Sequence, residues 1–176
     1  VWLGDGAVQG GDLTLFDADA DEIVKAIESE GGRASERQQT QKSVREFTIR
    51  LSDGKALRTK LRHLGLIGEG RGLCRSIPPA YFMASESQRR QLVRGLMDTD
   101  GTVSRGQRRC EYSSSSPALA YGVRDLLVSL GYKVKVYWKH PEFMHNGERR
   151  TGRVSYTVAF FVENGAEVFH VSRYHR

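Results

Sequence analysis

The sequence has little of several features that define large classes of protein. Its 176 residues include two cysteines and four prolines. It has no hydrophobic run near the roughly 20 residues of a membrane span. Cys74 and Cys110 have no metal-site spacing, so we expect two reduced thiols in a cytoplasmic protein. Apolar residues make up 39%, which excludes a disordered chain.

Acidic residues are scarce outside the first segment of the chain. The net charge is +6, from 27 Lys and Arg against 21 Asp and Glu. Residues 1–32 sum to −7, residues 33–94 to +9 and residues 95–176 to +4. A cationic body indicates a polyanionic partner, nucleic acid first. A solvated basic surface explains the charge alone equally well.

The chain contains one long-period repeat. An apolar helical stretch ends in Asp5-Gly6, and another ends in Asp100-Gly101, 95 positions later. After each come a turn, a strand pattern, an amphipathic helix and a glycine. The repeat predicts an α+β fold of two similar halves, residues 1–90 and 91–176. We expect each half to be a small antiparallel sheet with helices on one face.

Periodicity places the elements between these landmarks. Alternation predicts strands over 44–51, 133–139 and 155–162. Helical spacing predicts helices over 19–30, 57–64, 80–84, 91–97 and 117–130. The last of these has Ser116 as N-cap, Pro117 at its first position and Gly131 past its end. Residues 35–43 and 140–153 are expected to be polar loops.

The Asp-Gly motifs place acids where a helix disfavours them. Gly6 and Gly101 suit the left-handed position that follows a helix. An aspartate in the last turn is unfavourable, because that end already has partial negative charge. Two such aspartates, Asp5 and Asp100, indicate compensation by a cation.

Small residues beside the motifs would let the two helices pack side by side: Gly4, Gly95 and Thr99. The two aspartates would then meet, together with the carbonyl oxygens of the helix ends. We therefore expect Asp5, Asp100, Gly4 and Thr99 to hold Mg²⁺, which prefers oxygen ligands. A calcium loop starting at Asp98 is excluded, because its fifth and twelfth positions hold a threonine and an arginine.

These residues resemble the motifs of a known family. The nine residues 93–101, Val-Arg-Gly-Leu-Met-Asp-Thr-Asp-Gly, resemble the signature of LAGLIDADG homing endonucleases. Residues 2–6, Trp-Leu-Gly-Asp-Gly, are similar to the first motif of members found in inteins. Residues 75–78, Arg-Ser-Ile-Pro, resemble the Lys-x-Ile-Pro block that precedes the second motif in intein endonucleases.

The resemblance implies two αββαββα halves whose motif helices form the central interface. The sheets would form a saddle over duplex DNA, and both strands would be cut with Mg²⁺. Asp5 and Asp100 match the metal-binding acids, and Asp98 would be a helix-end residue. Arg75 matches the basic catalytic residue, but an arginine does not readily transfer a proton. In the second half only Arg173 is a candidate for that role.

Basic side chains on the expected DNA side are candidates for DNA binding. One strand pattern places four residues on one face: Lys133, Lys135, Tyr137 and Lys139. The hairpin after the second motif adds Arg105, Arg108 and Arg109, and the first half adds Arg50. Cationic side chains on such a surface would contact phosphates and bases.

The sequence therefore predicts a monomeric, site-specific DNA endonuclease. We expect the endonuclease domain of an intein, with the splicing domain as its partner in cis and the nucleoid as its place when bound. Splicing residues would lie outside these positions, and the first motif helix would lack its first turns. One alternative is a degenerate member that binds DNA or RNA without cleaving it. Another is a regulatory DNA-binding protein, which should have a helix-turn-helix not found here.

Overall fold

The computed structural model describes residues 1–6, 11–37, 43–67, 75–104 and 108–175. The elements of residues 1–90 are α1 (Trp2–Asp5), β1 (Asp12–Phe16), α2 (Asp17–Ser29), β2 (Arg33–Glu36), β3 (Val44–Arg50), α3 (Leu57–His63), and the 3₁₀ helix η1 (Pro79–Met83). Those that follow are α4 (Glu86–Asp100), β4 (Gly101–Val103), β5 (Arg109–Ser114), α5 (Pro117–Ser129), β6 (Lys135–Lys139), β7 (Glu142–His145), β8 (Glu148–Thr151), β9 (Ser155–Phe161), η2 (Gly165–Glu167) and η3 (Ser172–Tyr174). No helix in the described ranges is long and apolar enough to cross a membrane.

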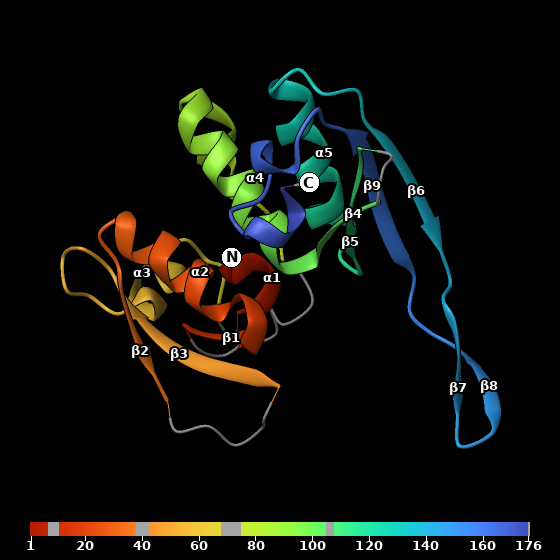
Figure 1. Ribbon diagram of the computed structural model, residues 1–176, viewed down its shortest axis with the longest axis horizontal. Helices are drawn as coiled ribbons and strands as arrows, with labels where there is room; N and C mark the ends of the chain where they lie inside the picture. Colours follow the sequence, from red (N-terminus) through yellow and green to blue (C-terminus); the bar gives the residue numbers. More distant parts are fainter. Residues whose placement is uncertain (7–10, 38–42, 68–74, 105–107, 176) are drawn as a thin grey trace.

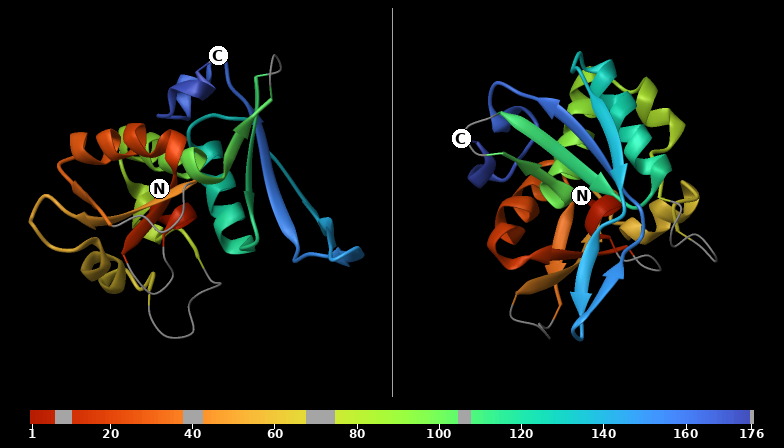
Figure 2. Two further views of the ribbon diagram at one scale, coloured as in Figure 1. Left: turned by 60° about the horizontal axis from the view of Figure 1, so that its bottom comes forward. Right: turned by 90° about the vertical axis from the view of Figure 1, so that its right-hand side faces the viewer.

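Two antiparallel sheets repeat one topology. The first has the strand order β1-β3-β2, and the second has the order β4-β5-β9-β6. In the first half, Gly6 bridges to Leu13 of β1, and in the second Gly101 pairs with Tyr112 of β5. The sheets lie on opposite sides of the α1–α4 pair (Figures 1 and 2). The predicted α+β fold with two similar halves is confirmed.

Local sequence signals set the ends of the longer helices. Ser85 and Gln88 form a reciprocal capping box at the start of α4. The Ser116 hydroxyl accepts from the backbone N–H of Leu119 at the start of α5, as predicted. Gly131 follows α5 in the left-handed region, with φ +90°.

One apolar core joins the two halves. The predicted alternation on β3 buries Phe47 and Ile49, and that on β9 buries Val158 and Phe160. Helices α4 and α5 add the fully buried side chains Val93, Leu96, Met97, Leu119, Val123, Leu126 and Leu127. Burial of this apolar surface is the main force that holds the sheets to the helices.

The prediction of a polar loop over residues 140–153 is wrong. Strands β7 and β8 form a hairpin that projects beyond the ends of β6 and β9 (Figure 1). Asn146 and Gly147 form its two-residue turn, both with positive φ, 52° and 80°. Asn-Gly is the preferred sequence for such a turn, so the signal was present. Both faces of this two-stranded ribbon are exposed, which explains why most of its side chains are polar.

Other features also differ from the predictions. Helix α4 extends beyond the predicted 91–97, and α2 begins at Asp17 instead of residue 19. The expected loop over residues 35–43 begins later, because β2 continues to Glu36. The strand expected from residue 133 begins at Lys135. The second half ends in the short helices η2 and η3 rather than in an α-helix.

The C-terminal segment is tied to both halves. Asp98 of α4 is buried and accepts hydrogen bonds from the backbone N–H groups of His170 (2.8 Å) and Val171 (3.2 Å). Its second oxygen lies 2.7 Å from Nδ1 of His170. Glu22 of α2 accepts from the backbone N–H and the hydroxyl of Ser172. The segment therefore connects α4 with α2.

Replacing Asp98 with alanine is expected to destabilise the protein by roughly 3 kcal/mol, because it leaves two backbone N–H groups without their charged acceptor. Urea unfolding would measure the loss, and hydrogen exchange at residues 170–171 would locate it. As a control, Asp125→Ala at an exposed position of α5 should change stability by no more than about 0.5 kcal/mol. Equal effects of the two variants would contradict the assignment.

Candidate active site

The two motif helices pack closely through small residues. A Cβ atom on Gly4 would lie 2.0 Å from Oγ1 of Thr99 and 2.8 Å from Oδ2 of Asp100. A Cβ atom on Gly95 would lie 2.6 Å from the backbone nitrogen of Val1. Only glycine permits this approach. The structure thus brings the end of α1, with Asp5, against the end of α4, with Asp100.

The prediction that Gly6 and Gly101 have a left-handed backbone is wrong. Both are extended, with φ −75° and −92°, because Gly101 begins β4 directly after α4 and Gly6 forms a β-bridge with Leu13 directly after α1. Their glycine identity has another cause. A Cβ atom would lie 2.4 Å from the carbonyl oxygen of Trp2 in one case and of Met97 in the other. The turn from helix to strand has no room for a side chain.

The two motif carboxylates lie in a site where their ionisation is disfavoured. Burial and the charge of Asp100 raise the pKa of Asp5 to about 6, against an opposing effect of Arg75. Burial also raises the pKa of Asp100, again opposed by Arg75. A cation bound between the two carboxylates would therefore stabilise their ionised forms.

Arg75 lies at the end of α1. Its guanidinium donates to the carbonyl oxygens of Leu3 (2.6 Å), Gly4 and Gly6, and it lies 5.4 Å from the centre of the Trp2 ring. A cation at this end offsets the partial negative charge of the exposed carbonyls. The carbonyl of Gly4, a predicted metal ligand, is thus engaged by Arg75.

The segment around Arg75 is held by the second half of the chain. The Ser116 hydroxyl donates to the carbonyl oxygen of Arg75 at 2.8 Å. Ile77 is buried and faces Gly122 of α5. The Ile-Pro block therefore anchors Arg75 between the two motifs.

A pocket of about 270 Å³ opens beside the second carboxylate. It is lined by Leu3, Gly4, Arg75, Asp100, Ser113, Ser114, Ser115, Ser116 and Leu119. Sequence reasoning missed the four serines as site residues, because uncharged residues at the end of a strand gave no signal of a site. A larger hollow of about 830 Å³ has a mostly apolar lining and contains neither motif carboxylate.

The donors at the site are oxygen atoms. Among the described residues, no group of three or more histidine, cysteine, aspartate or glutamate side chains could hold a metal. Two carboxylates and the carbonyls of the last helical turns, including that of Thr99, remain as ligands. The Gly4 carbonyl accepts from Arg75 and would offer a metal only its second lone pair. This set fits a hard cation such as Mg²⁺ better than a zinc-type metal.

Arg173, the candidate basic residue of the second half, lies elsewhere. Its guanidinium pairs with the buried Asp19 of α2 at 2.7 Å and lies over the ring of Tyr174. The contact with α2 accounts for its position, and the second half keeps no basic residue assigned to catalysis.

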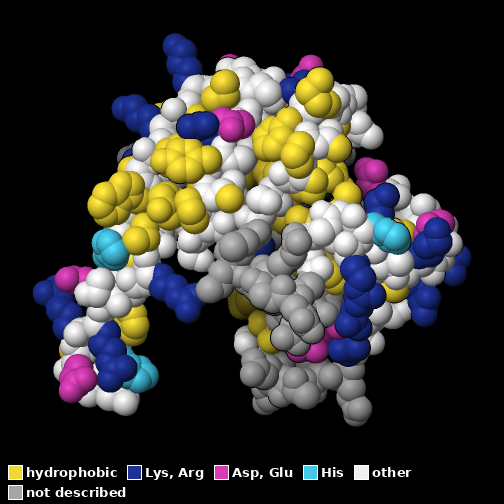
Figure 3. Space-filling model, turned by 180° about the vertical axis from the view of Figure 1, so that it is seen from behind, with side chains coloured by type: hydrophobic (Ala, Val, Ile, Leu, Met, Phe, Trp, Pro, Cys, Tyr) yellow, Lys and Arg dark blue, Asp and Glu magenta, His cyan; other side chains and the backbone are white. Residues whose placement is uncertain are grey.

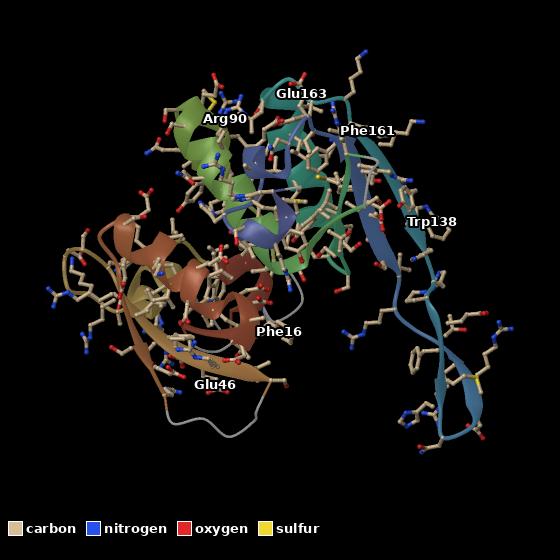
Figure 4. All side chains as sticks on the ribbon, viewed as in Figure 1. Phe16, Glu46, Arg90, Trp138, Phe161 and Glu163 are labelled. Carbon is tan, nitrogen blue, oxygen red and sulfur yellow. The ribbon has the colours of Figure 1, made fainter. Side chains whose placement is uncertain are left out.

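The predicted DNA-binding residues lie on the sheet faces that turn away from the helices. Glu46 points from β3 to the side away from α2 (Figure 4), and Arg50 is exposed on the same face. On the second sheet, Lys135, Tyr137 and Lys139 of β6 are exposed, and so are Arg108 just before β5 and Lys133 before β6. Tyr137 and Arg109 lie on the same face and contact one another at 3.3 Å. Arg105 lies outside the described residues.

The β7–β8 hairpin adds basic residues that the sequence reasoning missed. Arg149 and Arg150 of β8 are exposed, and so is Arg153 just after it. Seen from behind, the hairpin stands clear of the body, with Lys and Arg side chains along it (Figure 3). The Asn146-Gly147 signal could have placed these arginines on a ribbon instead of in a loop.

The raised pKa of Asp5 leads to a pH-dependent stability. Unfolding returns this group to its ordinary pKa near 3.9, so the folded state binds more protons between about pH 4 and 6. The free energy of unfolding should therefore fall as the pH rises through this window. Without metal at pH 7, Asp5→Asn is expected to raise Tm by about 2–4 °C, from roughly 1 kcal/mol after solvent screening.

Thermal unfolding in EDTA at pH 4 and pH 7 would check this prediction. The gain in Tm should be smaller at pH 4, where wild-type Asp5 is largely protonated. Asp125→Asn, at an exposed site, serves as the control. A lower Tm for Asp5→Asn at pH 7 would contradict the electrostatic account.

The chain resembles known proteins in both sequence and structure. Residues 87–164 match the family profile of the LAGLIDADG-like domain. The replicative DNA helicase DnaB of Mycobacterium intracellulare is 32% identical over 163 residues, which are 93% of this chain and 23% of that protein. The ATP-dependent DNA helicase Hel308 of Thermococcus kodakarensis is 37% identical over 89 residues, 48% of this chain and 8% of that protein.

Among solved structures, mesophilic variants of the homing endonuclease I-DmoI are similar. The TM-score is 0.57 at 11% sequence identity, and the match covers 98% of this chain and 89% of that one. The chain thus has the fold of a homing endonuclease over nearly its whole length. Residues 87–164 match a LAGLIDADG-like domain, and the resemblance to LAGLIDADG homing endonucleases that the motifs predicted is thereby confirmed. The chain spans about a quarter of the length of the DnaB relative.

Proposed function

We propose that this chain is a site-specific endonuclease that cleaves both strands of duplex DNA with Mg²⁺. The observation that supports this most directly is the meeting of Asp5 and Asp100 at the ends of the packed motif helices. Sheets with outward basic residues lie on either side of that pair. An acidic site between two cationic surfaces suits a phosphodiester held in place by its neighbouring phosphates.

Asp5, Asp100 and the carbonyl oxygens of Gly4 and Thr99 would hold the metal. Bound there, Mg²⁺ would supply an activated water and neutralise charge on the leaving oxygen. The aspartates must be ionised to bind it, and each would serve one strand. Arg75 lies beside both carboxylates and would stabilise negative charge on the phosphate, because its guanidinium stays protonated.

The comparisons support an intein as the parent protein. Two helicases that differ in name and organism each contain a minor segment similar to this chain. A module inserted into unrelated hosts would give this pattern. We infer that the chain is such an inserted endonuclease, acting as a monomer with a splicing domain in cis.

A second candidate function is DNA binding without cleavage. It is favoured by Arg75, whose guanidinium engages the carbonyl of Gly4 that would otherwise face a metal. In that case the basic sheet faces would still bind duplex DNA. The two candidate functions differ only in whether the bound DNA is cleaved when Mg²⁺ is present.

Cleavage of a supercoiled plasmid tests both. The plasmid would contain a site that the protein selects from a random duplex library, and the reaction would compare Mg²⁺ with EDTA. We expect linear product in the reaction with Mg²⁺ and none in the reaction with EDTA. Selective binding with no cut in either strand would favour the binding-only function. Failure to bind any duplex would reject both.

A further inference from the structure

Each sheet has an ion pair on its outward face. In the first half, Asp12 of β1 lies 3.3 Å from Arg37, just after β2. In the second half, Glu111 of β5 lies 2.7 Å from Arg109 on the same strand. A second group holds each acid: the Thr48 hydroxyl donates to Asp12 at 2.9 Å. The Tyr137 hydroxyl likewise donates to Glu111 at 2.7 Å.

The two acids occupy equivalent positions in the repeat. Each directly precedes the residue that pairs with its motif glycine, Gly6 for Asp12 and Gly101 for Glu111. The register across the three strands agrees. The two equivalent rows are Asp12–Thr48–Ser35 and Glu111–Ala159–Lys135.

The partners from the edge strands also correspond. Arg37 lies two residues beyond Ser35, and Tyr137 lies two residues beyond Lys135. The duplication therefore retains, on both sheets, an acid held by a side chain that reaches across the middle strand. The arginines themselves are not equivalent, because Arg37 follows β2 and Arg109 lies on β5. Each pair lies on its own sheet and would meet its own half-site of the DNA.

An acid on a DNA-binding face repels phosphate, so non-specific affinity does not explain these residues. It would instead cancel the charge of its arginine and fix the orientation of the guanidinium. The arginines remain available to a ligand, with 56% of the Arg37 side chain and 38% of the Arg109 side chain exposed. A fixed guanidinium in the major groove is suited to guanine, whose O6 and N7 accept its two N–H groups.

We propose that the pairs Asp12–Arg37 and Glu111–Arg109 read one guanine each, one in each half-site of the DNA target. The arginines contact the base, and the acids are positioning residues. This inference rests on the proposed function, namely that the outward sheet faces bind duplex DNA. Lys135 differs, since it has no ion-pair partner among the described residues and would contact phosphate.

The first experiment measures binding to a random-sequence duplex in EDTA as a function of salt. Glu111→Gln frees the charge of Arg109, so binding should tighten and the salt slope should steepen by about one unit. Lys135→Ala should weaken binding and flatten the slope by about one unit. A purely structural role for Glu111 would not strengthen binding. An unchanged or weaker affinity of Glu111→Gln would overturn the positioning role.

The second experiment selects sites from a random duplex library. Wild type should enrich a motif with a guanine on each side of its centre. Arg109→Ala should lose one preference and Arg37→Ala the other, each by about tenfold or more. Lys135→Ala should keep both. Circular dichroism would confirm that each variant folds.

The outcomes separate this inference from the proposed function. If wild type enriches a motif that Arg109→Ala and Arg37→Ala leave intact, the reading pairs are wrong and the function stands. Loss of both preferences on the same side of the centre would overturn the assignment of one pair to each half-site. If wild type enriches no motif and binds no duplex, the proposed function fails, and this inference with it.

Discussion

Replacing Asp100 with asparagine is expected to reduce double-strand cleavage by at least about 10³-fold, the equivalent of roughly 4 kcal/mol of transition-state stabilisation. The substitution keeps the shape of the side chain and removes one of the two carboxylates at the helix ends. Because each aspartate would serve one strand, residual cutting should appear as nicked plasmid. The measurement is the ratio of linear to nicked product with Mg²⁺ on the selected site.

Two variants control for indirect effects. Asp5→Asn should give the same loss of linear product with the nick in the other strand, which end-labelled DNA would reveal. Asp125→Asn, exposed on α5, should cut at the wild-type rate. Linear product formed by Asp100→Asn at the wild-type rate would reject the two-carboxylate mechanism.

Replacing Gly4 with alanine is expected to cost more than about 3 kcal/mol of stability, at the upper end for overpacking. A Cβ atom there would lie 2.5 Å from Cβ of Thr99, and both atoms belong to packed helices that cannot move apart freely. Tm should fall by roughly 6–12 °C in a domain of this size. Cleavage should fall too, since the same contact sets the separation of the two aspartates.

Gly54→Ala is the matched control, because a Cβ atom there meets nothing within 4 Å. Its positive φ of 77° limits the expected cost to about 1–2 kcal/mol. Gly4→Ala combined with Thr99→Gly should be more stable than the sum of the single variants predicts, because the second change removes the contacted atoms. Additive effects would show that the helices do not meet at this point.

Short-range patterns predicted much of the fold. The alternation on β3 and β9, the Ser116 cap and the paired Asp-Gly motifs each depend on a few neighbouring residues. The repeat then supplied the arrangement of the halves, because two copies of one unit pack about a common axis. The failure at residues 140–153 has a different cause. The prediction gave more weight to the polar composition of this segment than to the Asn146-Gly147 turn. The turn is the feature that sets the backbone conformation of a hairpin.

The site was predictable in its acids and less so in their surroundings. Asp5 and Asp100 stand out because acids at helix ends are unfavourable without a partner. The contacts of Arg75 with three carbonyl oxygens join residues about 70 positions apart, which no local pattern can show. The serines of the pocket lie at the end of β5 and in the turn that leads to α5. Asp98 binds the backbone N–H groups of residues 170 and 171. The sequence of that segment has no helical or strand periodicity from which this contact could be predicted.

The tie between α2 and the C-terminal segment has a consequence for the order in which this chain folds. Glu22 and Ser172 are 150 residues apart in sequence, yet they form two hydrogen bonds. During synthesis the first half emerges well before Ser172 exists, so α2 must wait for its partner. Contacts between such distant residues form late and slow the overall reaction. The last step of folding should be the closure of the C-terminal segment across both halves, which locks the paired motif helices in place.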